Sequence, residues 1–541
     1  MNTSKEFVPT GRSRAASNPR RMRHSFRSYL FAALLAASAV PCHAGLPPAV
    51  YNLGSIGGST GATISGPGLA AHAGTTLVGN CDFNGDGIAD FVVGAPPAGA
   101  AGGGAVYIVY GTATGAAPPF SLNDADVAIF GESDGDGLGS SLACGDVNGD
   151  GIDDLVIGAP AATAAGYAYV VYGGLTLPST LDLTSLTATQ GMRIPGLVNN
   201  TAFGWASAVG DANGDGIADL IVTAPGARSS SPNTGQGFVI FGSSTLPGTF
   251  DLSTLNGSNG FAISATDLLS PTPAGDSVAI GDLNDDGFGD IAFGSRSAYP
   301  NGLSSAGEVW VVYGHAGAFA PELQVGNLNG GNGFALEPAH SGEFAGSSLA
   351  FVSDFNGDGT PDLVIGAPAT SSGPQFGTAF VVFGKGGNAF PAHFGLGTLD
   401  GTNGVALVSP NVGDYAGASV AGIPDLNGDA LGEIAVGAPQ ASVGGTGAGG
   451  GWVVYGRKVP WPATVSLSTL DGGTGFYMQG AALSDAAGTA VASAGDSNRD
   501  GLHDVLISAP LADVNGSVNV GQIYVLYGND LIFADGFDGA P

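Results

Sequence analysis

Basic residues are scarce in this chain, which limits the partners it can have. Only 14 of its 541 residues are Lys or Arg, against 45 Asp or Glu, and the formal net charge is −31. Seven of the 14 basic residues lie between Lys5 and Arg27, so the rest of the chain is strongly acidic. An acidic surface repels polyanions, and nucleic acid and anionic membrane surfaces are therefore poor candidates for partners.

Long apolar runs are missing after the first 44 residues. The early basic residues are followed by the apolar stretch 29–40 and by Cys42-His43-Ala44. This order is typical of a secretory signal peptide that is cleaved after Ala44. No later run is long enough to span a bilayer, so we expect no membrane span in the mature chain.

Cleavage after Ala44 defines three regions. We expect a signal peptide at 1–44, a folded domain at 45–528 and a C-terminal tail at 529–541. The mature chain keeps seven basic and 44 acidic residues, a net charge of −37. We expect a soluble monomer that is secreted or held at the cell surface or in the periplasm. Arg20-Arg21 leaves twin-arginine export as the alternative to ordinary secretion, and Met22 is an alternative start.

Only two cysteines remain after cleavage, Cys81 and Cys144. They lie one and two residues before two copies of an acidic motif, on strands that we expect to be neighbours. Side chains alternate along a strand, so this offset places the two thiols on opposite faces. The two cysteines can form a disulfide in an oxidising compartment, but we favour two separately buried thiols.

The acidic motif recurs seven times with the pattern Asp-x-Asn-x-Asp-x-x-x-Asp or Glu. Successive copies start 64, 65, 71, 72, 71 and 71 residues apart. These intervals are too long for a helical solenoid repeat and suit one four-stranded sheet each. The sequence therefore predicts an all-β fold, a seven-bladed β-propeller of four-stranded antiparallel blades. The copies start at Asp82, Asp146, Asp211, Asp282, Asp354, Asp425 and Asp496.

Each repeat predicts four strands separated by glycine-rich turns. In the fourth repeat these strands are expected at 275–281, 290–294, 307–314 and 333–336. The seventh repeat ends after its third strand, near Tyr527, whereas a matching fourth strand at 61–65 stands alone before the first repeat. We therefore expect the N-terminal strand to complete the last blade and close the ring, which leaves no open edge.

The acidic loops have the composition of calcium sites. Calcium prefers six to eight hard oxygen ligands, and Asp and Asn at alternate positions of a tight loop point their oxygens toward one centre. In the first loop the backbone carbonyl of Ile88 adds a ligand, Gly87 allows a sharp turn, and Asp90 closes the site at position nine. The loop is not an EF-hand, because its twelfth position is Val93 and strands flank it.

The predicted calcium ligands occupy positions one, three, five, seven and nine of each loop. The sixth loop departs from the pattern, with Ala430 in place of Gly and Glu433 in place of Asp, so we expect six to seven structural ions. Seven ions would change the net charge of the mature chain from −37 to −23. The ligands are Asp82, Asn84, Asp86, Ile88 and Asp90; Asp146, Asn148, Asp150, Ile152 and Asp154; Asp211, Asn213, Asp215, Ile217 and Asp219; Asp282, Asn284, Asp286, Phe288 and Asp290; Asp354, Asn356, Asp358, Thr360 and Asp362; Asp425, Asn427, Asp429, Leu431 and Glu433; and Asp496, Asn498, Asp500, Leu502 and Asp504.

The repeats resemble FG-GAP repeats, the units of the integrin α-chain N-terminal propeller, over about residues 61–528. Phe203-Gly204 followed by Ala224-Pro225 resembles the FG and GAP elements, and Ala345-Gly346 with Gly366-Ala367-Pro368 is similar to a common variant. The resemblance implies a propeller whose acidic loops join the first two strands of each blade and bind calcium. Acidic loops in every blade make the chain similar to a bacterial, free-standing relative. Integrin ligand recognition depends on a partner chain and is not implied.

The sequence shows no evident catalytic constellation, and its histidines lack metal or triad spacing. Gly275-Asp276-Ser277 resembles a hydrolase motif, but other repeats carry Gly-Ser-Ser and Gly-Ala-Ser there, which favours strand packing. We therefore expect a secreted module, not an enzyme, that binds an extracellular protein or glycan. A secreted hydrolase or lyase and a structural matrix protein are the alternatives.

Exposed aromatic residues at one rim would favour glycan binding. Two of the four tryptophans fall in third strands and are expected in the core, at Trp310 and Trp452. The other two candidates are Trp205 and Trp461.

Overall fold

The computed structural model describes most of the chain as a ring of β-sheets. The described residues are 49–96, 102–112, 118, 120–163, 165–174, 177–197, 202–226, 235–265, 274–369, 376–387, 390–442 and 447–528. All of them belong to one compact unit, Ala44–Pro541. The predicted signal peptide and C-terminal tail lie outside the described residues. Within that described part the helices are short 3-10 turns, none of which is long and apolar enough to cross a membrane.

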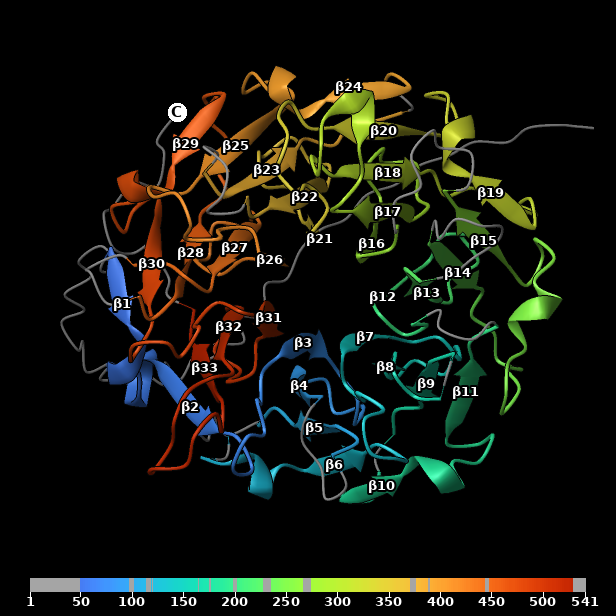
Figure 1. Cartoon of the computed structure of the whole chain (residues 1–541), viewed down its shortest axis with the longest axis horizontal. Coiled ribbons are helices and arrows are strands. Elements are labelled where there is room, and N and C mark those ends of the chain that lie inside the picture. Colours follow the sequence, from blue (N-terminus) through green and yellow to red (C-terminus); the bar gives the residue numbers. More distant parts are fainter. Residues whose placement is uncertain are drawn as a thin grey trace, which may run out of the picture. The chain divides into compact units, whose positions relative to one another are not determined.

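Seven sheets, each with four antiparallel strands, surround a common centre, which confirms the predicted seven-bladed propeller (Figure 1). The first strand of each blade is innermost and contacts the first strands of both neighbouring blades. These strands are β3 (Thr76–Cys81), β7 (Ser141–Gly145), β12 (Ser207–Gly210), β16 (Ser277–Gly281), β21 (Ser348–Val352), β26 (Ser419–Ile423) and β31 (Val491–Gly495). The second strands are β4 (Asp90–Ala95), β8 (Asp154–Ala159), β13 (Asp219–Ala224), β17 (Asp290–Ser295), β22 (Asp362–Ala367), β27 (Glu433–Ala438) and β32 (Asp504–Ala509).

The third and fourth strands extend each blade outward. The third strands are β5 (Ala105–Val109), β9 (Tyr167–Val171), β14 (Gln236–Ile240), β18 (Glu308–Val312), β23 (Thr378–Val382), β28 (Gly450–Val454) and β33 (Gln522–Leu526). The fourth strands are β6 (Val127–Phe130), β11 (Gly191–Pro195), β15 (Gly260–Ser264), β20 (Gly333–Glu337), β25 (Gly404–Val408), β30 (Gly475–Gln479) and β2 (Gly61–Ser65).

The N-terminal strand β2 closes the ring as the sequence predicts. It pairs antiparallel with β33, from Gly61 opposite Leu526 to Ser65 opposite Gln522. A second N-terminal strand, β1 (Val50–Asn52), pairs in parallel with β30 of the sixth blade. The repeat pattern does not predict β1. The N-terminal segment therefore pairs with two blades, the sixth and the seventh.

Short fifth strands also extend beyond the four-strand prediction. In five blades such a strand pairs in parallel with the outer edge, and in four of these it comes from the next repeat. Each of these short strands precedes a 3-10 turn. The segment that leads into the fourth strand of one blade therefore also pairs with the outer edge of the preceding blade. These strands are β10 (Thr180–Asp182), β19 (Glu322–Gln324), β24 (His393–Gly395), β29 (Thr464–Ser466) and the N-terminal β1. The described 3-10 turns are η1 (Leu53–Ser55), η2 (Gly58–Thr60), η3 (Leu122–Asp124), η4 (Leu183–Ser185), η5 (Leu252–Thr254), η6 (Pro300–Gly302), η7 (Val325–Asn327), η8 (Leu396–Thr398) and η10 (Leu467–Thr469).

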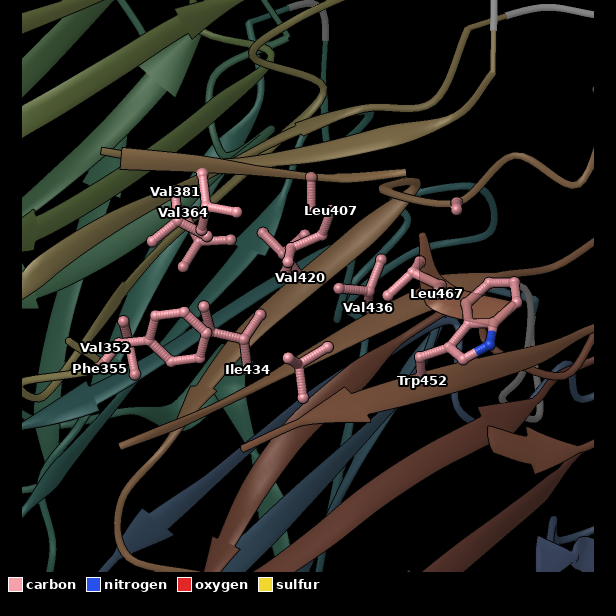
Figure 2. Close-up of a cluster of buried hydrophobic side chains, with 14 of the residues drawn as sticks. Val352, Phe355, Val364, Val381, Leu407, Val420, Ile434, Val436, Trp452 and Leu467 are labelled. Atoms are coloured by element: carbon pink, nitrogen blue, oxygen red, sulfur yellow. The ribbon is translucent and has the colours of Figure 1, made fainter. Parts of the chain in front are cut away.

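The hydrophobic core consists of seven clusters, one between each pair of neighbouring blades. Alternate residues of a strand face opposite neighbours: Phe91 and Val93 pack toward the seventh blade, whereas Val92 packs toward the second. Sheets covered on both faces require nearly continuous apolar strands, and all six residues of β4 are buried. Figure 2 shows the cluster between the fifth and sixth blades, where Val364 and Leu407 lie near Val420.

The prediction of two separate thiols is wrong, because Cys81 and Cys144 form a disulfide. The bond joins β3 to β7, the inner strands of the first two blades. The pairing of β3 with β4 contains a bulge between Gly79 and Cys81, and Asn80 has a positive φ of 63°. Cys81 pairs opposite Asp90, which is the register of Gly145 in β7 and one position beyond that of Cys144. The two cysteines thus lie on opposite faces of their own blades, and in the ring these two faces meet between the first and second blades.

Closure by β2 predicts a large difference between two N-terminal substitutions. Ile64 of β2 has no exposed surface, whereas Val50 of β1 is 47% exposed. Ile64→Ala should lower the free energy of unfolding by about 2–5 kcal/mol through the lost contacts and the cavity. The exposed control, Val50→Ala, should change it by less than about 0.5 kcal/mol. Urea unfolding would measure both, and equal effects would contradict closure by β2.

Candidate metal centres

The seven acidic loops connect first strands to second strands and bind to one another around one face of the ring. The N–H at position eight donates to the carbonyl at position one of the preceding loop, as in Asp153 to Asp82 at 3.2 Å. A second N–H, just after the third strand, donates to position two of that loop, as in Gly174 to Phe83 at 2.7 Å. The first of these bonds recurs from Ala218 to Asp146, Gly289 to Asp211, Gly432 to Asp354 and His503 to Asp425.

This network also crosses the junction of the ring. Thr112 of the first blade donates its N–H to the carbonyl of Ser497 in the seventh loop at 3.5 Å. Position eight of the fifth loop is Pro361, which has no N–H and so cannot make the first kind of bond. Each loop therefore contributes to blade packing as well as to a possible ion site.

The predicted ligands at positions one, three and five turn toward backbone amides within their own loop. Asp82 accepts the N–H of Asp86 at 3.0 Å and that of Gly87 at 2.8 Å. Asn84 Oδ1 also accepts the Asp86 N–H, and Asp86 Oδ1 accepts the Ile88 N–H, both at 2.9 Å. These oxygens therefore gather at the loop tip. The last of these bonds recurs at the N–H groups of Ile152, Ile217, Phe288, Thr360, Leu431 and Leu502.

The carboxylate at position nine has a second role that the sequence does not indicate. Asp290 Oδ2 accepts the N–H of Leu283 and Oδ1 accepts the N–H of Gly314, both at 3.0 Å. Gly314 follows the third strand, so the carboxylate ties the loop to that strand. The five other Asp loops repeat both bonds. In the sixth loop Glu433 Oε2 accepts the Leu426 N–H at 2.6 Å.

All seven closing carboxyl groups are fully buried, and burial raises each pKa. The pKa rises to about 7 for Asp90, Asp154, Asp219 and Asp504, to about 8 for Asp290 and Asp362, and to about 9 for Glu433. The ion pairs in the described part of the chain involve Glu132, Asp276, Glu343 and Glu337, none of them in an acidic loop. No basic side chain there lies at ion-pair distance from a loop carboxyl group, so each buried carboxyl group either keeps its proton or is neutralised by a cation.

The arrangement fits a cation in donor chemistry, although the side chains do not converge fully. Within the described ranges no three His, Cys, Asp or Glu side chains meet around one point. The predicted sites, however, combine carboxylates with Asn and backbone oxygens. Asp354 Oδ1 is buried and accepts no hydrogen bond there, which leaves a charged oxygen free for a ligand. Such an oxygen is costly to bury without a partner.

Position seven, predicted to ligate through its carbonyl oxygen, also packs neighbouring loops together. A Cβ atom on Gly85 would lie 3.1 Å from Ile152 Cδ1 of the second loop, and one on Gly149 would lie 3.0 Å from Ile217 Cδ1. Glycine at position four thus permits close contact between loops. This inter-loop packing cannot be seen in the repeat pattern alone.

The tryptophans divide largely as predicted. Trp310 and Trp452 are buried core residues, and Trp205 is 43% exposed. Trp461 is also buried, so it does not belong to a rim; its ring stacks on Phe355 and lies beside the Arg457 guanidinium. Trp205 is therefore the one rim candidate of the four.

The FG-GAP repeat family matches seven segments of the chain, one in each blade. Each match begins just before the first strand and ends in or at the third, so it encloses the acidic loop. The segments are 74–109, 138–171, 203–240, 274–312, 345–382, 416–454 and 487–526.

Curated relatives match only parts of the ring. Integrin alpha pat-2 of Caenorhabditis elegans is 31% identical over 44% of this chain and 18% of its own length. Integrin alpha-V of Gallus gallus is 30% identical over 42% of this chain and 20% of its own. Phosphatidylinositol-glycan-specific phospholipase D of Rattus norvegicus is 34% identical over 29% of this chain and 19% of its own. The chain thus spans about a fifth of the length of the curated relatives it matches.

The two roles of loop carboxylates can be separated by substitution. Asp290→Asn places an amide NH₂ against one of two backbone N–H donors, and should lower the free energy of unfolding by about 1–3 kcal/mol even in excess EGTA. The control is Asp286→Asn in the exposed part of the same loop, which should change it by less than about 0.5 kcal/mol in EGTA. Urea unfolding in EGTA measures both, and a stronger effect at Asp286 would refute the bridging role of Asp290.

Position six gives a second prediction, specific to the sixth loop. Ala430 occupies the left-handed region with φ of 64°, where the other loops carry glycine. A left-handed conformation costs a non-glycine residue about 1–2 kcal/mol. Ala430→Gly should therefore raise the midpoint of urea unfolding. The matched reverse change, Gly359→Ala, should lower it, because nothing lies within 4 Å of the added Cβ and only the φ of 95° opposes it. Shifts of the same sign would contradict the argument.

Proposed function

We propose that this integrin-α-like propeller of seven FG-GAP repeats is a calcium-stabilised binding module that works outside the cell. The observation that carries the calcium part is the set of acidic loops on one face, each with a buried closing carboxyl group and no basic partner at ion-pair distance among the described residues. A cation supplied from solution would stabilise the ionised form of these carboxyl groups. Calcium is the cation whose preference for carboxylate, amide and carbonyl oxygens these loops match.

The residues that would hold calcium are those at positions one, three, five and seven of each loop. Asp354 offers a buried oxygen that accepts no hydrogen bond, and Asp358 and Asn356 lie at the same loop tip. Position nine would contribute through the remaining lone pairs of a carboxylate that already accepts two N–H bonds. The ion would supply charge neutralisation and rigidity. Because the loops also link the blades, binding at the tips would stabilise the ring as a whole.

The binding part of the proposal rests on the fold and its relatives. Integrin alpha chains match 42–44% of this chain, and the propeller offers a rigid scaffold with variable loops at its rims. An extracellular protein or glycan is the class of partner we propose. Phospholipase D activity belongs to the relative of that name, of which this chain covers 19%, and we do not extend it to this chain.

An extracellular location is supported by two features. The N-terminal 44 residues have the order of a secretory signal peptide. Cys81 and Cys144 form a disulfide between two inner strands, and such bonds persist in oxidising compartments. Millimolar calcium outside the cell would also suit sites of moderate affinity, at about 10⁻⁴ to 10⁻³ M.

Calcium should raise the thermal stability of the mature chain strongly. At ~5 mM calcium each site of that affinity would add about 1–2 kcal/mol. Scanning calorimetry in calcium and in excess EGTA measures the shift, and elemental analysis of the dialysed protein counts the ions. We expect six or seven ions. No shift and no bound calcium would refute the metal assignment.

A matched pair of controls separates specific sites from general screening. Magnesium at equal ionic strength should stabilise the chain much less, because it dehydrates reluctantly and demands octahedral geometry. Asp286→Asn should reduce the ion count by one and leave the other sites filled. If magnesium and calcium act equally, the stabilisation is screening of the net charge and not site binding.

A further inference from the structure

Because the chain contains seven copies of one repeat, equivalent residues of the seven blades can be compared on the face opposite the acidic loops. First strands begin at this face, around the mouth of the central channel. A glycine precedes each first strand, and the residue that follows this glycine is small in five repeats, namely Thr75, Ser140, Ser347, Ala418 and Thr489. The third and fourth repeats carry Trp205 and Asp276 instead. Two adjacent blades therefore depart from the pattern at the same position.

The fourth repeat departs at a second position that contacts the first. Arg296 takes the place where the six other repeats carry proline after the second strand. Its backbone N–H, which proline lacks, donates to Asp276 Oδ2 at 3.0 Å, and its Nε lies 3.3 Å from Asp276 Oδ1. The two departures thus form a single ion-paired unit. The prolines are Pro96, Pro160, Pro225, Pro368, Pro439 and Pro510.

A cavity of about 720 Å³ is lined by Trp205 and by this ion pair. Phe344 and Tyr415 of the following repeats also line it. Both aromatic residues have positive φ, 59° and 60°, in the region that disfavours bulky side chains. The volume is that of a small-molecule site, and its aromatic walls with a few fixed polar groups are typical of one.

The polar and apolar groups of the cavity are accessible. Trp205 is 43% exposed, and the Arg296 side chain is 54% exposed although its Nε is paired. The side chain of Asp276 is only 10% exposed, and Arg296 holds its orientation. The site therefore combines a flat aromatic surface with an oriented acceptor and a donor of opposite charge.

We propose that this cavity, on the binding module proposed above, takes a neutral sugar residue of a glycan. The C–H face of a pyranose ring carries weak positive charge and stacks on the negative face of an indole ring, here Trp205. Adjacent hydroxyl groups need both a donor and an acceptor, which Arg296 and Asp276 supply as charge-assisted hydrogen bonds. The inference depends on the proposed binding function and gives it a ligand class.

Charge favours a neutral ligand over an acidic or a basic one. Arg296 is already paired, and the chain as a whole carries a net charge of −31, so an anionic sugar or acidic peptide would meet repulsion. A basic peptide would have to displace Arg296 from Asp276. A neutral sugar uses both groups without breaking the pair.

The test is binding of the full mature chain, in calcium, to an array of neutral, sialylated and uronic-acid glycans. Immobilised deglycosylated fibronectin and collagen form a second arm. Trp205→Ser and the double variant Asp276→Ser/Arg296→Pro install residues that sibling repeats already carry, so the fold should survive, and calorimetry checks this. Phe120→Ala is the matched control, because Phe120 is 81% exposed and does not line the cavity.

We expect binding to neutral glycans that falls at least tenfold in both site variants and is unchanged in Phe120→Ala. Tryptophan fluorescence should respond to bound glycan in the parent chain and not in Trp205→Ser. Binding to acidic glycans alone, to no glycan, or equally well in the site variants would overturn the proposal. Retained binding to fibronectin or collagen without glycan binding would overturn the sugar assignment and leave the binding function standing; no binding in either arm would remove support from both.

Discussion

The structure depends on one constraint, that both faces of every blade are apolar. The second strands are buried along their whole length, and alternate side chains enter different inter-blade clusters, so a single blade cannot bury its own surface. The ring must close for the last such surface to be covered. Strand β2 closes the ring, and its Ile64 lies in the cluster between the seventh and first blades. The interval of the repeat and the position of the unpaired strand follow from this requirement.

The acidic loops create the opposite problem, since they concentrate charge at a packed interface. Each of the six closing Asp carboxylates accepts two backbone N–H groups, as Asp290 does from Leu283 and Gly314, and this compensates part of its desolvation. The bonds between loops carry the packing from blade to blade. A bound cation would supply the remaining compensation. The proposed structural metal would therefore bind the same loops that pack the blades together.

The sequence predicted the blades, the closing strand and the loop positions because these recur in register. It failed where the cause is local or non-repeating. Cys81 and Cys144 lie on opposite faces of their own blades, and they form a disulfide because the ring brings these two faces of neighbouring blades together, which the strand pattern of a single repeat does not show. The fifth strands are three residues long, which is too short for an alternation of side chains to identify them in the sequence. Trp461 was a rim candidate because the repeat pattern does not show that its ring stacks on Phe355 of the fifth acidic loop and lies beside the Arg457 guanidinium.

The repeats also separate residues that hold the fold from residues that can confer specificity. A residue that recurs in all seven blades, such as Asp at position one of the acidic loops, reflects a requirement common to every blade. A residue that differs in one blade is not explained by that requirement. Arg296 stands where the other repeats have proline, so it adds a backbone N–H, and Asp276, which accepts this N–H, also differs from its equivalents in the other repeats. Paired departures satisfy each other's hydrogen bonds, so they leave the scaffold intact while they alter its surface. A symmetric ring can thus acquire one asymmetric site without loss of the packing on which closure depends.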